Sequence, residues 1–273
     1  MSGDTPKAPY GGVRVVLAPN AGLMTGPGTN QYLLGEGGDA VLIDAAPLDD
    51  ENRRRLATAG VQIHALYLTH VHPDHVGGAH AVRETFGVPL AVHQSRRDFP
   101  VGPGPLGAER SLEDGDELPY PGGRLRVLHA PGHESGHVCY YEPERRWLFT
   151  GDNVLSTGTA VIAPPDGDMR QYLATLERLD ALDVAVIFPG HGPPIETPHE
   201  KLREYLAHRR EREQQVLDAL AAGLASIEAM VPRIYPDLHP GLFWAAAAQL
   251  RAHMDKLVAE GRVVDEGGQL RLR

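Results

Sequence analysis

The stretch THVHPDHVGGAH, residues 69–80, carries four of the 14 histidines in this chain of 273 residues. It comes directly after the apolar run IHALYLT (63–69), which predicts a buried β-strand. Residues two apart in an extended segment point the same way, so His70 and His72 can bind one metal ion together. The stretch therefore predicts a metal site at the end of a strand.

Asp74 and His75 follow in the same stretch, at the turn into a helix predicted over residues 77–87. They face a different direction from the first pair, which suits a second ion nearby. Gly77 and Gly78 let the backbone pass close to such a site. A single histidine here would most often be a surface residue or a satisfied core residue. Four metal-binding side chains within six residues favour a metal site instead.

Three later fragments each place one more candidate ligand in a turn of small residues at the end of a predicted strand. They are His133 in APGHESGH (130–137), Asp152 in LFTGDNV (148–154) and His191 in FPGHGPP (188–194). Rigid scaffolds commonly present functional side chains at strand ends. Each turn alone is more often structural, but their recurrence together with the first cluster indicates one shared site.

The first part of the chain, up to about residue 198, alternates strands with loops and helices. Further strands are predicted at residues 13–19, 31–36, 40–45, 89–93, 124–130, 137–143, 146–152 and 184–190. Helices are predicted at residues 49–60, 77–87 and 169–182. Two strand-rich halves with helices between them predict an α/β sandwich, in which two sheets pack together and helices lie outside.

The pattern changes near residue 199, where amphipathic helices take over. We predict helices at residues 198–223, 226–235 (capped by Ser226) and 242–261, then a hairpin over 262–273 that turns at EGG. This is the order of a winged-helix-like unit, which can bind nucleic acid but also serves packing or homodimer contacts. The predicted domains are a catalytic domain, 1–198, and a C-terminal helical, winged-helix-like domain, 199–273.

The formal net charge of −10 is unevenly distributed. Residues 1–198 hold 15 lysines and arginines against 25 aspartates and glutamates, whereas residues 199–273 hold 11 of each kind. An acidic chain does not attract polyanions over long range. A nucleic-acid partner would need a local basic surface or bound metal.

The sequence predicts a cytoplasmic protein without a membrane partner. Its first residues, MSGDTPKAPYGG, lack the apolar core of a signal peptide, and no stretch approaches 18 uninterrupted apolar residues. The single cysteine, Cys139, cannot form an internal disulfide, which fits a reducing compartment.

The set His70-x-His72-x-Asp74-His75, followed by His133, Asp152 and His191, resembles the metallo-β-lactamase fold in its hydrolase branch. The resemblance covers nearly all of the first 198 residues and implies an αββα sandwich. It also implies that one ion is held by His70, His72 and His133, and the other by Asp74, His75 and His191, with Asp152 bridging. A true antibiotic-degrading enzyme is disfavoured, because His75 follows Asp74 and Cys139 lies in a predicted strand.

The segments GPGTNQYLLG (26–35) and HRREREQQVL (208–217), with the C-terminal helical unit, look like the β-lactamase-like protein 2 group. That group includes a metal-dependent endoribonuclease acting on single-stranded RNA. Thioesterases of the glyoxalase II kind share the fold and a similar amino-terminal stretch. The C-terminal helical unit matches the β-lactamase-like protein 2 group better, and the resemblance does not decide the substrate.

Five histidines and two aspartates suit two divalent metal ions, with zinc favoured and manganese or iron as alternatives. A hydroxide bridging two such ions would be the nucleophile, and no GxSxG motif is present. Asp74 is the predicted catalytic carboxylate. His137 is a candidate proton donor or substrate contact, with a structural role left open.

The leading hypothesis is a dinuclear metal hydrolase that cleaves single-stranded RNA. The alternative is a thioesterase or lactonase acting on a small ester or thioester. A third hypothesis is a non-catalytic, metal-stabilised binding module, which is disfavoured because structural metal sites are usually closed and mononuclear.

Overall fold

The computed structural model describes residues 10–266 and 269–273, which form two compact units. The first unit holds the residues up to His129 together with Gly136–Gly158 and Asp183–Glu196, and the second holds Ala130–Ser135, Thr159–Leu182 and Thr197–Arg273. The linear division into domains 1–198 and 199–273 stays a prediction. Among the described residues, no helix combines the length and apolarity needed to cross a bilayer.

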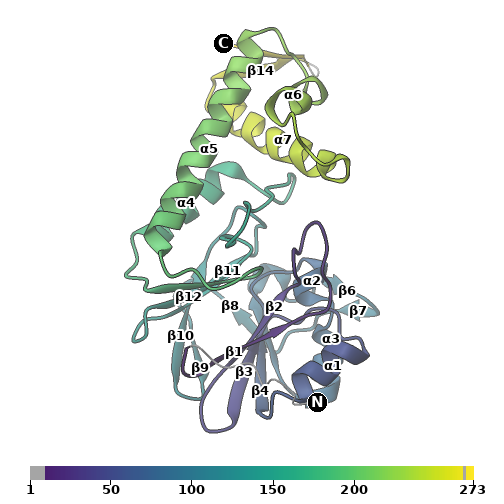
Figure 1. Cartoon of the computed structure of the whole chain (residues 1–273), viewed down its shortest axis with the longest axis vertical. Coiled ribbons are helices and arrows are strands. Elements are labelled where there is room, and N and C mark those ends of the chain that lie inside the picture. Colours follow the sequence, from purple (N-terminus) through teal and green to yellow (C-terminus); the bar gives the residue numbers. More distant parts are fainter. Residues whose placement is uncertain (1–9, 267–268) are drawn as a thin grey trace. The chain divides into compact units, whose positions relative to one another are not determined.

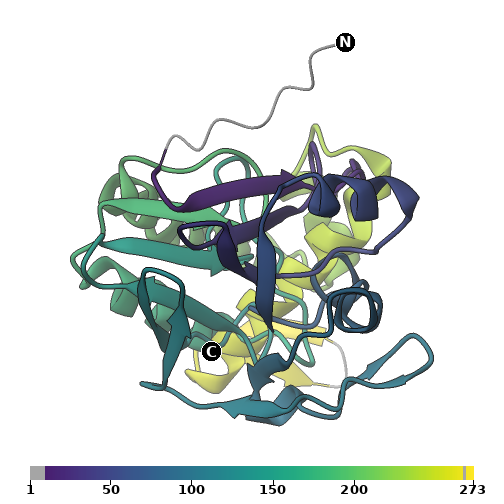
Figure 2. The same ribbon diagram turned by 90° about the horizontal axis from the view of Figure 1, so that it is seen from below.

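The first unit contains a six-stranded and a five-stranded sheet (Figures 1 and 2). The strand order of the larger sheet is β1 (Val13–Leu17), β2 (Asn30–Leu34), β3 (Asp39–Ile43), β4 (Gln62–Tyr67), β5 (Leu90–His93) and β8 (Arg110–Leu112). That of the smaller sheet is β13 (Val186–Pro189), β12 (Trp147–Gly151), β11 (Val138–Glu142), β10 (Gly123–His129) and β9 (Glu117–Tyr120). A separate small hairpin is formed by β6 (Pro100–Val101) and β7 (Gly104–Pro105).

Parallel pairing brings the ends of strands distant in sequence to a common edge. In the larger sheet, β3, β4, β5 and β8 run parallel, and in the smaller sheet β12 and β13 do so. Since the carboxyl ends of parallel strands lie at the same edge, the turns that follow them can share one site. All candidate ligands except His133 lie after strands of this kind, whereas His133 follows β10, which pairs antiparallel with β9 and β11.

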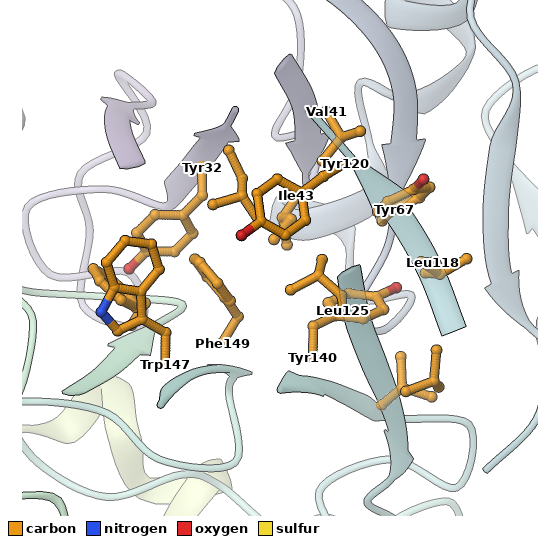
Figure 3. Packing of buried hydrophobic residues seen from close by; sticks show 14 of the residues in the cluster. Tyr32, Val41, Ile43, Tyr67, Leu118, Tyr120, Leu125, Tyr140, Trp147 and Phe149 are labelled. Carbon is orange, nitrogen blue, oxygen red and sulfur yellow. The ribbon is translucent and has the colours of Figure 1, made fainter. Parts of the chain in front are cut away.

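The core of the first unit lies between the two sheets (Figure 3). Tyr32 of the larger sheet meets Phe149 of the smaller sheet edge to face, with ring centroids 5.2 Å apart. Both side chains are almost completely buried. Burial of a side chain of this size stabilises the fold by about 1.5–3 kcal/mol. Aromatic packing thus fixes the two sheets against each other.

Alternate residues of the larger sheet point to its outer face. Leu33, Leu42 and Leu66 pack there against Leu56 and Val82. Leu56 lies in α1 (Asp50–Ala57) and Val82 in α3 (Ala79–Phe86), helices that cover this face (Figure 1). Period-two alternation with apolar residues on both sides is expected of a strand buried between two layers.

The second unit is mainly helical. Its elements are α4 (Met169–Asp180), α5 (Pro198–Ala221), α6 (Ile227–Ile234), a short 3₁₀ turn at Pro240–Leu242, α7 (Phe243–Ala259) and the hairpin β14 (Val263–Glu266) and β15 (Gln269–Leu272). Ser226 caps α6 as predicted, because its hydroxyl accepts the N–H of Ala229. The predicted hairpin forms, and the two glycines of its EGG turn lie outside the described residues.

The core of this unit joins α5, α6, α7 and the hairpin. Val216, Met230, Leu250 and Met254 are completely buried in it, together with Val263 of β14. The three helices and the hairpin therefore pack around a shared apolar core.

Candidate metal centre

The histidine-rich stretch leaves β4 and turns into two short helices. His72 precedes α2 (Pro73–Val76), where Pro73 occupies the first helical turn, a position that needs no backbone N–H. Gly78 then passes the backbone so closely that a Cβ atom there would lie 2.1 Å from the carbonyl oxygen of Ala46. Glycine is therefore required at this position, just after Asp74 and His75.

Asp152 and His191 follow the parallel strands β12 and β13, and each is preceded by a glycine. A Cβ atom on Gly190 would lie 2.4 Å from Oδ1 of Asp152 and 2.8 Å from Cε1 of His75. No larger residue fits at this place without displacing both side chains. The Gly-His turn is therefore a packing requirement of the site itself.

Asp74, His75, Asp152 and His191 converge in the first unit. One potential ligand atom from each lies within 4.8 Å of the others. Nε2 of His75 is 3.3 Å from Oδ2 of Asp74 and 3.2 Å from Oδ1 of Asp152. Nε2 of His191 is 3.1 Å and 3.4 Å from the same two oxygens, and 3.4 Å from Nε2 of His75.

These spacings fit a tetrahedral metal ion. Ligand atoms about 2.0–2.1 Å from a zinc ion at the centre of a tetrahedron are about 3.3 Å from one another. The five separations given above, 3.1–3.4 Å, match that edge length. Two imidazole nitrogens and two carboxylate oxygens are also the donor types that zinc accepts. The residues present therefore fit a divalent ion.

The electrostatics of this group favour a cation. Burial would lower the pKa of His75, but the charges of Asp152, Asp74 and Asp44 raise it well above its usual value. Burial likewise works against charge on His191, yet hydrogen bonds to Asp152 and Asp74 raise its pKa to about 10.

The carboxylates show the complementary effect. Burial would raise the pKa of both Asp74 and Asp152, but the charge of His75 and hydrogen bonds from His191 and His75 hold both pKa values well below the usual range. In the metal-free protein two carboxylates thus keep positive charge on two imidazoles. A divalent ion would replace those protons.

The three remaining predicted ligands are divided between the two units: His70 and His72 lie in the first unit and His133 lies in the second. Burial and the neighbouring histidines lower the pKa of His70, which therefore stays neutral, as a metal ligand must be. The structure thus gathers four of the seven predicted ligands into one group, and the role of each ligand stays a prediction.

His137 is completely buried, and its ring stacks on that of His70 with centroids 4.8 Å apart. The side-chain amide of Asn153 donates a hydrogen bond to its Nδ1, at 3.1 Å. This placement fits the structural role left open above, in which His137 supports the ring of His70. Its part as a proton donor stays a prediction.

The sequence reasoning missed residues that orient the ligands. Asp44 is buried, and its Oδ2 accepts a hydrogen bond from Nδ1 of His75 at 2.8 Å. The hydroxyl of Thr69 donates to Asp44 at 2.9 Å and lies 3.0 Å from Nδ1 of His70. One carboxylate thus orients His75 directly and His70 through Thr69, leaving both Nε2 atoms for metal. The signal was an aspartate at the end of an apolar strand.

His191 is fixed in the same way by the backbone. Its Nδ1 donates to the carbonyl oxygen of Gly28 at 3.1 Å. This carbonyl belongs to the segment GPGTNQYLLG, whose Thr29 hydroxyl also lies 3.3 Å from Oδ2 of Asp74. The glycine-rich segment near the start of the chain therefore supports two ligands.

Comparisons with known proteins agree with this geometry. Residues 24–191 match the family model of the metallo-beta-lactamase superfamily, and residues 226–269 match that of the beta-lactamase associated winged helix domain. A beta-lactamase-like protein 2 homolog from Drosophila melanogaster is 34% identical over 267 residues, covering 91% of this chain and 88% of its own length.

Two further proteins are similar. An atrochrysone carboxyl ACP thioesterase from Paecilomyces divaricatus is 36% identical over 210 residues, which cover 75% of this chain and 63% of the relative. The crystal structure of a metallo-beta-lactamase family protein from Thermus thermophilus superposes with a TM-score of 0.81 at 25% identity, covering 96% of this chain and 99% of that one.

The α/β sandwich and the winged-helix domain expected from the sequence are confirmed by these matches. The His/Asp group of the first unit is typical of the dinuclear site of this fold. With its family model, its relatives and its metal-binding side chains in agreement, the chain belongs to the metallo-beta-lactamase superfamily and is a hydrolase of that fold.

Proposed function

We propose that the protein is a dinuclear zinc hydrolase whose substrate is an acyl thioester. The observation that carries the metal assignment is the tetrahedral spacing of Asp74, His75, Asp152 and His191. A divalent ion bound there would lower the pKa of a coordinated water and polarise the substrate carbonyl. The chain itself supplies the ligands and fixes their orientation through Asp44 and the carbonyl of Gly28.

Two observations support a thioester over a polyanion. A relative with 36% identity over 75% of this chain is named as an acyl carrier protein thioesterase. The chain also carries a net charge of −10, which opposes long-range attraction of nucleic acid. Hydrolysis of a neutral carbonyl by a metal site needs no basic surface around it.

Cleavage of single-stranded RNA is the second candidate. It is favoured by the match to the β-lactamase-like protein 2 relative, which extends over 91% of the chain. It is also favoured by the winged-helix domain, a domain type that binds nucleic acid in many proteins. Residues 199–273 contain 11 basic and 11 acidic side chains. Their balanced charge repels RNA less than the excess negative charge of residues 1–198 does.

The experiment combines metal analysis of the purified protein with a side-by-side screen of acyl thioesters, lactones and single-stranded RNA. We expect two zinc ions per chain and turnover of a thioester that disappears in Asp74→Ala. Asp39→Ala is a matched control, because Asp39 is a half-exposed carboxylate of the same unit whose side chain pairs with His64. Turnover of RNA alone would overturn the thioester assignment, and undiminished turnover by D74A would overturn the metal centre.

A further inference from the structure

The segment between β12 and α4, residues 152–168, has no regular secondary structure. Its residues Ala160 and Ile162 are nevertheless buried. Buried backbone N–H and C=O groups outside helices and sheets need partners from side chains. Here those partners come from α5 and α7 of the second unit.

Gln249 of α7 makes hydrogen bonds to the backbone of the residues on both sides of Val161. Its side-chain oxygen accepts the N–H of Ile162 at 2.7 Å, and its amide nitrogen donates to the carbonyl oxygen of Ala160 at 3.4 Å. Arg209 of α5 donates to the same carbonyl at 2.6 Å, with its guanidinium 5.2 Å above the ring of Tyr172. The backbone around Val161 is thus fixed on two sides.

The carbonyl oxygen of Val161 accepts a hydrogen bond from Nδ1 of His133 at 2.7 Å. A carbonyl accepts only, so Nδ1 carries the proton and Nε2 keeps the lone pair needed for a metal ion. This bond sets the tautomer and the ring orientation of His133. It is the counterpart, for this ligand, of the bond between Asp44 and His75.

The two interactions share one peptide group. The N–H of Ile162 and the C=O of Val161 lie in the same planar trans peptide and point in opposite directions. Fixing the N–H with Gln249 therefore aims the C=O at His133. Hydrogen bonds on both ends of a peptide also polarise each other, which strengthens the second bond.

We propose that Gln249 is a positioning residue for the metal centre. It acts through the Val161–Ile162 peptide to hold His133 in the tautomer and direction that bind metal. Gln249 lies within residues 226–269, which match the winged-helix domain. This domain would then contribute to metal binding by orienting a ligand. This inference rests on the proposed metal-dependent hydrolase.

The test uses the full-length protein, zinc with a competing chelator, and cobalt as a spectroscopic probe. Gln249→Met keeps the length of the side chain but offers no hydrogen bonds. It should raise the dissociation constant of one of the two ions by about 10- to 100-fold and leave the other unchanged, as loss of a ligand's support does elsewhere. Gln249→Glu keeps an acceptor for Ile162 and should restore most of the affinity.

Leu250→Ala is the matched control, since Leu250 is the next residue of α7 and is buried in the helical core. It should lower the melting temperature and leave both zinc dissociation constants unchanged. If Gln249→Met does not fold, Gln249→Asn, whose amide is too short to reach both partners, should weaken the same ion. In a His133→Ala background, the Gln249 substitution should have no further effect on zinc binding.

The inference is overturned if wild-type protein binds two ions and the folded Gln249 variants bind them equally well. It is also overturned if these variants weaken zinc binding as much without His133 as with it. A wild-type protein that binds no metal would refute the proposed function, and the inference with it. Cobalt spectra separate these results, because the absorption of the bound ion changes when its ligands or their geometry change and stays the same when they do not.

Discussion

Asp44 lies 2.8 Å from His75, with its Oδ2 facing Nδ1 of the imidazole, and both side chains are buried. The backbone of Asp44 has a φ of +63°, a conformation that few residues other than glycine, asparagine and aspartate adopt. The position of Asp44, its backbone conformation and its hydrogen bond together orient the imidazole of the predicted ligand His75.

Asp44→Asn should therefore weaken metal binding while the fold persists. Asparagine tolerates the positive φ, but its neutral amide holds the imidazole less strongly than a carboxylate does. We expect the affinity for zinc to fall by about 10- to 100-fold, measured by chelator competition. Asp39→Asn, at the half-exposed pair with His64, should change nothing. Equal zinc affinity in D44N and wild type would show that Asp44 does not orient a ligand.

Metal binding should release protons. His75 and His191 hold raised pKa values in the metal-free protein and are protonated at neutral pH. An ion that binds to the Nε2 atoms of both residues must displace about two protons, one from each imidazole. Titration calorimetry near neutral pH in buffers of different ionisation enthalpy measures this number. Zinc binding without proton release would contradict the assigned ligands.

The metal-free protein should lose stability in alkali. The pKa of His191 rises from 6.5 to about 10 on folding, so its stabilising effect is complete below pH 6.5 and is lost as the pH rises through 10. The melting temperature of chelator-treated protein should fall over this range. The zinc-loaded protein should not show this fall, because its imidazole nitrogens carry metal instead of protons. A flat profile for the metal-free protein would argue against a charged His191.

Gly190→Ala should impair the centre without unfolding the protein. The added methyl would lie 2.4 Å from Oδ1 of Asp152, so this carboxylate has to move. Zinc affinity and turnover should both drop at least tenfold, while the circular dichroism spectrum stays that of the wild type. Gly104→Ala is the control, since a Cβ atom there has no neighbour within 4 Å. Full activity in G190A would mean that Asp152 lies outside the centre.

Phe149→Ala should cost about 3–5 kcal/mol in the free energy of unfolding. Phe149 is completely buried between the sheets, where it stacks on Phe188 and meets Tyr32. Phe243→Ala is a matched truncation at a side chain that is 42% exposed, and it should cost far less. Denaturant titration of both variants measures the difference. Similar losses would place the core elsewhere.

The sequence predicted the regular elements well wherever the apolar pattern extends over four residues or more. Each strand predicted for the two sheets forms, with ends shifted by one or two residues in most cases. The ligands were found because histidine and aspartate are conspicuous in turns of small residues. Their convergence depended mainly on the parallel pairing of strands. The resemblance to a known fold implied this pairing, whereas the individual residues gave no indication of it.

Residues 100–120 show where the pattern fails. Four short strands, β6 to β9, lie within this region, which is rich in glycine and proline, and none was predicted. Strands of two to four residues are too short to show a period in the sequence. β8 also pairs with β5 and not with a strand that is its neighbour in sequence.

The supports of the ligands were missed for a related reason. Asp44 was placed inside a predicted strand at residues 40–45, whereas β3 ends at Ile43 and the chain turns at Asp44. Gln249 looked like one polar residue of an alanine-rich helix, and its partners lie 87 and 89 positions away. A contact between an irregular segment and a helix distant in sequence cannot be predicted from the local sequence of either one.

The parallel register of β12 and β13 also dictates when the centre can come into existence during synthesis. Asp152 and His191 become neighbours only after the final strand of the smaller sheet has left the ribosome and docked beside β12. Non-local pairing of this kind forms slowly. A nascent chain that ends before β13 lacks His191, so the group of Asp74, His75, Asp152 and His191 could bind an ion only once β13 has been made and has paired with β12.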